Sequence, residues 1–211
     1  MFNLELVFPE IFLSLSIMFL LILGVFKKNS SKLIQNISLI ILLITAVITF
    51  NETLSINRTL LFSNSIVIDY LSSLMKIITL LSAFLVLVVS SNYLKIFKIF
   101  KIEYPILILS SVLGMMVMIS SNDLIVFYMG LELQSLALYV LATFNRDQLK
   151  SSEAGLKYFV LSALSSGLLL YGCSLIYGFT GSTNFDLIAD QLNTDQYVLT
   201  FGIVFILVGL A

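Results

Sequence analysis

The chain has 211 residues, of which 59% are hydrophobic and only 11% are charged, whereas a soluble domain carries roughly a quarter charged residues, so an ordinary soluble protein is excluded. The net charge is −1, which excludes the basic surface that a nucleic-acid partner would need. With one cysteine and no histidine, these residues alone cannot ligate haem, an iron–sulfur cluster or zinc.

Apolar runs of about 18 to 25 residues recur along the chain, the length that crosses roughly 30 Å of hydrocarbon as an α-helix. The alternating ten-residue segments typical of membrane β-barrels are not seen. We therefore predict an all-α, polytopic transmembrane helix bundle. The six complete spans that we predict are 9–26, 33–50, 65–93, 105–121, 124–144 and 153–178. A short interfacial helix is predicted at 185–192, and the last run, 197–211, reaches only about 22 Å and is predicted as a truncated seventh span.

Basic residues separate between alternate loops. The loops after the first, third and fifth predicted spans contain Lys27, Lys28, Lys32, Lys95, Lys98, Lys101, Arg146 and Lys150. The opposite side has Arg58 alone, together with Asp186, Asp190 and Asp195 in the loop after the sixth span. The positive-inside rule then predicts an N-terminus that faces outward, to the intermembrane space or the periplasm.

The fifth predicted span has a carboxylate, Glu132, at its centre. Burying it there costs roughly 2.5–3.5 kcal/mol on insertion scales, which makes it a functional candidate that faces a bundle interior. Polar residues that are four, three and four positions apart share the helix face of Glu132 and form a polar stripe. The stripe consists of Tyr128, Glu132, Ser135 and Tyr139, and it extends to Thr143 and Arg146. Our hypothesis is that Glu132 gains and loses a proton, with Tyr128, Ser135 and Tyr139 along a hydrated path; the alternative is a neutral structural carboxyl that holds helices together.

Two lysines lie within predicted spans. Lys157 is about one turn inside the sixth span and is either a proton carrier or one half of an exposed i,i+4 pair with Glu153. Lys76 lies deeper in the third span than Asp69, and we interpret it as snorkelling or as paired with another helix.

Cys173 is interpreted as a buried packing residue. Small residues four apart in the sixth span predict close helix packing; they are the pairs Ala163 with Gly167 and Ser174 with Gly178.

Three stretches, "LVFPEIF", "ELQSLALYVLATF" and "SSEAGLKYFVLSALSSGLLLYGCSLIYGFTGSTNFD", resemble the subunit 2 family of NADH:ubiquinone oxidoreductase, respiratory complex I. The resemblance implies an antiporter-like, proton-translocating subunit with two inverted five-helix repeats. Residues 1–104 would form three preceding helices, and residues 105–211 would begin the first repeat. Glu132 matches the family's fifth-helix glutamate and Lys157 its sixth-helix lysine, which implies catalytic roles in proton transfer for both.

The resemblance also implies partners and cofactors. The other membrane-arm subunits and membrane lipids would surround the chain, and flavin, iron–sulfur clusters and quinone would be held by partner subunits, with no cofactor here. Family members are much longer, and in them the run that resembles "FGIVFILVGLA" continues into a lysine-containing broken helix. We therefore expect either an incomplete sequence or, preferably, a split subunit completed by a second polypeptide, because a helix ending in lipid leaves unsatisfied carbonyls.

The sequence thus predicts part of an NADH:ubiquinone reductase that carries protons in response to quinone reduction elsewhere in the complex. The expected location is the mitochondrial inner membrane, with a bacterial plasma membrane as the alternative. Two other functions stay open: a subunit of a cation/proton antiporter or membrane-bound hydrogenase, and a structural fragment that pumps nothing.

Overall fold

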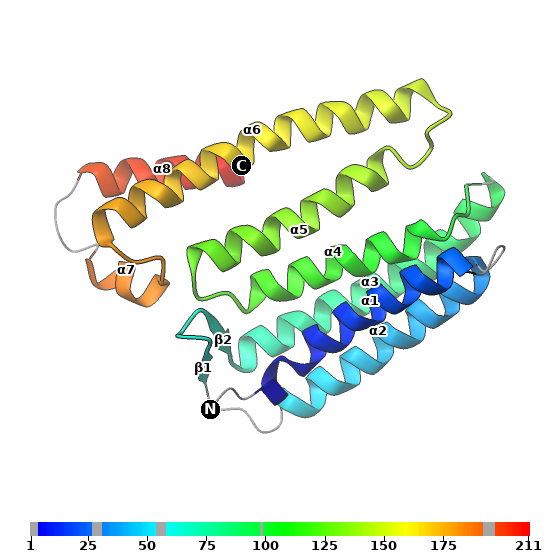
Figure 1. The fold of residues 1–211 in the computed structure, drawn as a ribbon, viewed down its shortest axis with the longest axis horizontal. Helices are drawn as coiled ribbons and strands as arrows, with labels where there is room; N and C mark the ends of the chain where they lie inside the picture. The colour runs from blue at the N-terminus through cyan, green and yellow to red at the C-terminus, as the bar shows by residue number, and fades with distance from the viewer. Residues whose placement is uncertain (1–3, 27–30, 54–57, 98, 192–196) are drawn as a thin grey trace.

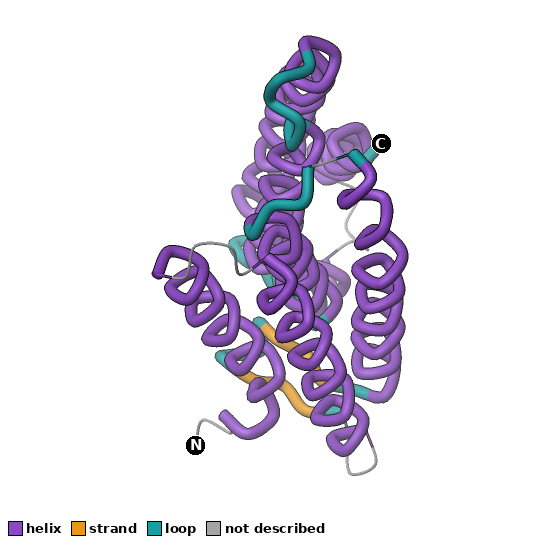
Figure 2. Tube along the Cα trace, turned by 90° about the vertical axis from the view of Figure 1, so that its right-hand side faces the viewer, coloured by secondary structure: helices purple, strands orange, loops and turns teal. Residues whose placement is uncertain are grey.

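A computed structural model describes residues 4–26, 31–53, 58–97, 99–191 and 197–211. The elements in chain order are a 3-10 helix η1 (Leu4–Val7), α1 (Phe8–Phe26), α2 (Ser31–Thr53), β1 (Thr59–Leu61), β2 (Ile66–Ile68), α3 (Tyr70–Ile96), α4 (Glu103–Ile119), α5 (Leu124–Ala142), α6 (Leu149–Thr180), α7 (Phe185–Gln191) and α8 (Tyr197–Leu210). Figure 2, coloured by element type, shows how fully helices dominate this part of the chain.

The predicted class, a polytopic helical membrane protein, is confirmed. Within the described ranges, five helices are long and apolar enough to cross a membrane, namely α1, α2, α3, α5 and α6. The predicted fourth span corresponds to α4, which is apolar but only 17 residues long. The short helix predicted at 185–192 is α7, and the predicted truncated span is α8, which has 14 residues. The division at residue 104 stays a prediction.

The third span begins five residues later than predicted, at Tyr70. The chain before it forms an antiparallel hairpin in which Thr59 pairs with Ile68 and Leu61 with Ile66. These β-branched and apolar residues extend the hydrophobic run of the helix, so the two were indistinguishable by hydropathy. Asp69 then caps α3: its carboxylate accepts from the Ser72 amide at 2.7 Å, and the Ser72 hydroxyl accepts from the Asp69 amide at 3.0 Å. This capping box explains why Asp69 stands at the helix start.

The helices run roughly parallel and antiparallel to one another, so their connections gather at two ends (Figure 1). At the hairpin end lie β1, β2, α7 and the turn between α4 and α5, whereas the links from α3 to α4 and from α5 to α6 lie at the opposite end. At the opposite end, Lys101 and Arg146 lie in described loops, and Lys32, Lys95 and Lys150 lie in the end turns of α2, α3 and α6. Lys27, Lys28, Lys98 and Asp195, which also entered the topology prediction, lie outside the described residues.

Two hydrophobic clusters hold the helices together. The first cluster joins the four helices α1, α2, α3 and α4. It contains Leu13, Leu20, Leu42, Leu87, Leu109 and Met116, which are all at most 1% exposed. The second joins α5, α6, α7 and α8 around Leu169, Cys173 and Ile176. Cys173 is thus a buried packing residue, as expected. Each fully buried leucine stabilises its cluster by roughly 1.5–3 kcal/mol relative to an exposed one in water, and in lipid tight packing takes over that role.

The turn between α4 and α5 connects the hairpin to α7. Its residue Asn122 donates through its side-chain nitrogen to the Asn64 carbonyl at 3.0 Å and to Asp186 at 3.1 Å. Its backbone amide donates to the Ser65 carbonyl at 2.8 Å, and its carbonyl accepts from the Phe185 amide at 3.1 Å. The exposed pair of Arg58 with Asp186, at 3.4 Å, adds to the same junction. The four-residue turn between α4 and α5 therefore joins the hairpin to α7 at this end of the bundle.

Two helix pairs approach closely enough to require glycine. On α4 and α5, a Cβ on Gly114 would lie 2.6 Å from the Gln134 amide nitrogen, and one on Gly130 would lie 2.8 Å from that of Met118. On α6 and α8, a Cβ on Gly172 would lie 2.8 Å from both the Gly202 carbonyl oxygen and the Ile206 nitrogen. In contrast, Cβ atoms on Gly167 and Gly178 would meet nothing within 4 Å. Within the described chain the predicted packing pairs therefore make no close helix contact, and their role in packing stays a prediction.

Replacing Gly172 by alanine should destabilise the protein by roughly 1–3 kcal/mol, because the added methyl meets backbone that cannot move aside. The matched control is Gly167→Ala on the same helix, which should be neutral or stabilising by up to about 1 kcal/mol through helix propensity. Unfolding of both variants in lipid nanodiscs measures the difference. Equal stability of the two variants would contradict the close contact between α6 and α8.

Candidate proton-transfer site

Helix α5 is fixed at its start and along one face. Asp123 caps it by accepting from the Ile125 amide at 2.8 Å, and Asp123 also forms a short hydrogen bond with the Thr183 hydroxyl beyond α6. The face that includes Gly130 rests on α4. Glu132 follows Gly130 by two residues, or about 200° around the helix. Its side chain therefore projects away from the α4 contact.

The Glu132 carboxylate lies in a partly buried position with one of its oxygens unsatisfied. The residue is half-buried, and Oε1 is fully buried without a hydrogen-bond partner among the described residues. Tyr128, one turn earlier, interacts with Glu132 and with Ser166 of α6. Of the sequence-predicted residues, Tyr128 and Glu132 are thus brought together. Ser166 is an addition that sequence reasoning missed, although it belongs to the "SALSSG" cluster of small polar residues on α6.

The other predicted path residues face different partners. The Ser135 hydroxyl donates to the Leu131 carbonyl of its own helix at 2.8 Å, a common arrangement for serine in a helix. Tyr139 is buried and forms a short hydrogen bond with the Ser162 hydroxyl of α6. Its ring also packs edge-on against Tyr158, with centroids 5.0 Å apart. Tyr139 therefore connects α5 to α6, and Ser162 is a second α6 hydroxyl that sequence reasoning did not single out.

Lys157 forms an ion pair with Glu153 at 2.6 Å, and their side chains are 67% and 63% exposed within this chain. The structure thus contains the i,i+4 pair that the sequence allowed. Helix α6 begins at Leu149, four residues before the predicted span, so Lys157 lies about two turns inside the helix rather than one. With 32 residues α6 is about 48 Å long, more than the roughly 30 Å of hydrocarbon. In the described part of the chain, no hydrogen bond or ion pair joins Lys157 to Glu132, and a proton-transfer role for the two stays a prediction.

Lys76 also has a partner, and it comes from another helix. Its ammonium lies 2.5 Å from Oε1 of Glu10 on α1. The two residues are only 3% and 8% exposed. The interpretation of Lys76 as paired with another helix is therefore correct for this structure, and its partner is Glu10 of α1. The sequence signal that could have indicated this pair is that Glu10 and Lys76 both lie within apolar runs.

No group of three metal-ligating side chains occurs in the part of the chain that the structure describes. The described membrane helices carry ionisable and hydroxyl side chains, which can bind and pass protons. Residues 121–211 match the family described as NADH:quinone oxidoreductase/Mrp antiporter, transmembrane. This part of the chain is therefore similar to antiporter-like membrane subunits.

Comparison with curated relatives narrows this class. The chain is 70% identical over 209 residues to NADH-quinone oxidoreductase subunit N of Pelagibacter ubique, and 49% identical over 212 residues to that of Maricaulis maris. Each match covers 99% of this chain but only 44% of the relative. The chain is therefore a homologue of subunit N that spans less than half the length of the curated relatives it matches.

Solved structures share the fold. A chain of respiratory complex I from Thermus thermophilus matches with a TM-score of 0.78 at 24% identity, over 96% of this chain and 43% of that one. A chain of an archaeal membrane-bound sulfane sulfur reductase matches with a TM-score of 0.83 at 23% identity, over 98% and 44%. At such low identity, these matches establish the shared arrangement of helices alone.

Proposed function

We propose that this chain is part of the proton-translocating membrane arm of an NADH:quinone oxidoreductase. In that role it would move protons in response to quinone reduction in other subunits, and it would contribute no redox centre. The homology to subunit N supports the assignment to this enzyme. The single observation that carries the proton role is the Glu132 carboxylate, half-buried in a membrane helix with Oε1 unsatisfied.

In the proposed mechanism Glu132 alternately binds and releases a proton. A buried carboxylate oxygen without a donor is costly, so the group gains from a proton or from an approaching cation. Tyr128 lies beside it and reaches Ser166, so these hydroxyls would guide a proton along the interface of α5 with α6. Tyr139 and Ser162 hold the same interface closer to the basic end. Lys157 would help to relay the proton by exchanging its Glu153 contact for a hydrated one.

The partners follow from the same assignment. The other membrane-arm subunits and lipids would cover the many apolar side chains that are exposed in this chain alone. Flavin, iron–sulfur clusters and quinone would belong to partner subunits. Because the curated relatives are about twice as long, the mechanism also requires the helices that they have in addition, supplied by this gene or by a second polypeptide. The bacterial relatives favour a plasma membrane over a mitochondrial inner membrane, with the N-terminus on the periplasmic side as the loop charges predict.

A cation/proton antiporter subunit is the second candidate. The matching family includes Mrp antiporters, and a chain of the Mrp complex from Dietzia has a TM-score of 0.76 at 23% identity. Such a protein would exchange cations for protons without NADH.

Inverted membrane vesicles distinguish the two functions. We expect vesicles that contain this chain to take up protons when NADH is added, and to lose this uptake with a quinone-site inhibitor or when the gene is deleted and not resupplied. Affinity purification of the tagged chain should recover a flavin-containing peripheral arm. Proton exchange that is driven by an imposed Na⁺ or K⁺ gradient and is indifferent to NADH would instead identify an antiporter.

A further inference from the structure

A pocket lies at the end of the bundle opposite the hairpin, where α4 begins and α5 ends (Figure 1). Its volume is about 190 Å³. The apolar part of its lining comes from three helices and the residues next to them, namely Leu21 of α1, Ile106 and Leu107 of α4, Val140 of α5, and Phe144 just beyond α5. The pocket therefore has an apolar interior that is shared by α1, α4 and α5.

Charged side chains complete the lining of this pocket. Lys101 lies in the loop before α4, Arg146 lies in the loop after α5, and Glu103 is the first residue of α4. A carboxylate in the first turn is favoured by the helix dipole, which accounts for Glu103. Two cations and one carboxylate give the lining a net charge of +1. The pocket thus combines an apolar interior with an excess of positive charge.

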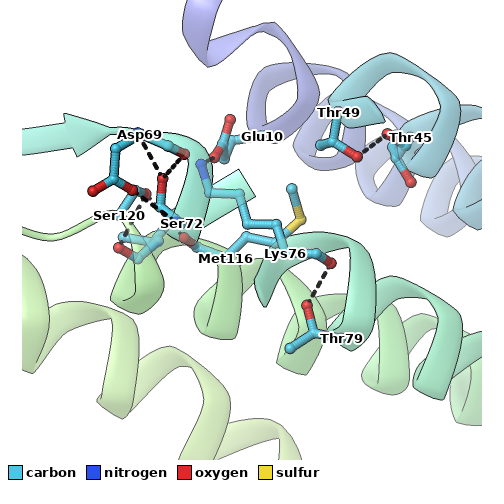
Figure 3. A network of polar contacts seen from close by, with 10 residues as sticks. Glu10, Thr45, Thr49, Asp69, Ser72, Lys76, Thr79, Met116 and Ser120 are labelled. Carbon is cyan, nitrogen blue, oxygen red and sulfur yellow. Dashed lines mark hydrogen bonds and ion pairs between the residues drawn. The ribbon is translucent and has the colours of Figure 1, made fainter. Parts of the chain in front are cut away.

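The two cations of the pocket are not neutralised within the described chain. The buried Lys76 has Glu10 as its counter-charge (Figure 3). In contrast, neither Lys101 nor Arg146 forms an ion pair or a hydrogen bond with another described residue. The Lys101 ammonium lies 5.8 Å from the centroid of the Phe144 ring, a cation–π contact that holds it beside the apolar wall of the pocket. Both cations are therefore available to an anion that enters the pocket.

The pocket lies at the depth where lipid headgroups meet the protein. The rings of Tyr104 and Phe144 pack edge-on with centroids 5.6 Å apart, and tyrosine is enriched at membrane–water interfaces. Lys101 and Arg146 belong to the loops that the positive-inside rule assigns to the cytoplasmic side. The cytoplasmic leaflet contains anionic lipids that attract basic segments next to membrane helices. Position and charge thus point to the same kind of ligand.

The two parts of the lining together select the class of ligand. A phosphodiester is an anion that arginine and lysine bind through charge-assisted hydrogen bonds. A free phosphate would leave the apolar part of the pocket unfilled, whereas an acyl chain would fill it. The volume of about 190 Å³ is below the roughly 300–1,000 Å³ of a small-molecule site, so the pocket holds only the headgroup end of a lipid. The remaining acyl chain then lies in the bilayer.

We propose that this pocket binds one phospholipid of net charge −1, of the phosphatidylglycerol class. Its phosphate lies between Lys101 and Arg146, and the upper part of an acyl chain packs on Leu107 and Val140. The lipid charge neutralises the net charge of the lining, and basic pockets between membrane helices bind anionic headgroups in this way. The site is separate from Glu132 and does not rest on the proposed pumping function.

Native mass spectrometry tests the site on the full-length protein, purified in mild detergent and stripped of lipid. The protein is titrated with phosphatidylglycerol, with phosphatidylcholine and with inorganic phosphate. We expect one molecule of phosphatidylglycerol to be retained more tightly than phosphatidylcholine, and inorganic phosphate not to displace it. Equal retention of the two lipids would overturn the proposal, and displacement by inorganic phosphate at equal concentration would show a site for a soluble anion instead.

Two double variants that remove the same charge locate the bound lipid. Lys101→Gln with Arg146→Gln should weaken phosphatidylglycerol binding by about 25-fold, because each basic side chain near an anionic lipid contributes about fivefold. The matched control, Lys95→Gln with Lys150→Gln, removes two exposed basic side chains at the same end that do not line the pocket, and binding should be nearly unchanged. Equal weakening by the two double variants would mean nonspecific attraction to a basic surface and would contradict a built site.

A third variant tests the apolar part of the pocket. Val140→Trp retains both cations and places a larger side chain in the pocket from a position that is 47% exposed, so the protein should fold but lose the bound lipid. Thermal unfolding with and without phosphatidylglycerol checks the fold and the loss together, since a ligand that binds the folded state raises its stability. Undiminished lipid binding by a folded Val140→Trp variant would show that no acyl chain occupies the pocket, and the proposal would be wrong.

Discussion

Replacing Glu132 by glutamine should lower NADH-driven proton uptake by at least about tenfold, since a positioned proton-transfer group contributes roughly 10²–10⁴ in rate. Glutamine has nearly the same size and can occupy the same half-buried position on α5, but it cannot ionise. Because Oε1 of Glu132 has no hydrogen-bond partner in the described chain, the substitution breaks no hydrogen bond of that atom. The loss should therefore fall on proton transfer rather than on assembly.

The measurement compares proton uptake and complex content in the same vesicles. Asp147→Asn is the control, because Asp147 is an exposed residue in the loop between α5 and α6. Glu132→Asp retains an ionisable group one methylene shorter, and we expect partial recovery. Normal uptake by a fully assembled Glu132→Gln complex would favour the purely structural role for this carboxyl that the sequence left open.

The sequence predicted the helices well because a membrane imposes a length and a polarity on each span. It failed where a second structure has the same hydropathy. Ile66, Val67 and Ile68 continue the apolar run of α3, yet they form a strand because the hairpin pairs them with residues 59–61. Likewise α6 begins at Leu149, within a polar stretch that no hydropathy criterion assigns to a span.

The candidate site was predictable only as a helix face. Spacing correctly placed Tyr128 beside Glu132, since one helix sets both positions. Spacing could not show that Ser135 bonds to its own backbone or that Tyr139 reaches Ser162, because these depend on rotamers and on how α6 packs. The Glu10–Lys76 pair joins residues 66 positions apart, so only the arrangement of α1 against α3 could reveal it.

Replacing Lys76 by methionine should destabilise the protein by about 3–5 kcal/mol, the cost of removing one member of a buried ion pair. Methionine retains most of the volume of lysine, so the loss reflects charge rather than a cavity. The Glu10 carboxylate would remain buried with neither oxygen satisfied, beside the half-buried Glu52.

Two controls identify the cause. Lys157→Met removes a lysine from an exposed pair with side chains 67% and 63% exposed, so it should change stability by less than about 1 kcal/mol. The double variant Glu10→Met with Lys76→Met replaces both charges and should recover most of the stability, because buried pairs exchanged for apolar residues are often neutral or stabilising. Unfolding of the three variants in lipid nanodiscs gives all three results. If Lys76→Met were no more destabilising than Lys157→Met, the Lys76 ammonium would have to be solvated, and Glu10 would not be its buried partner.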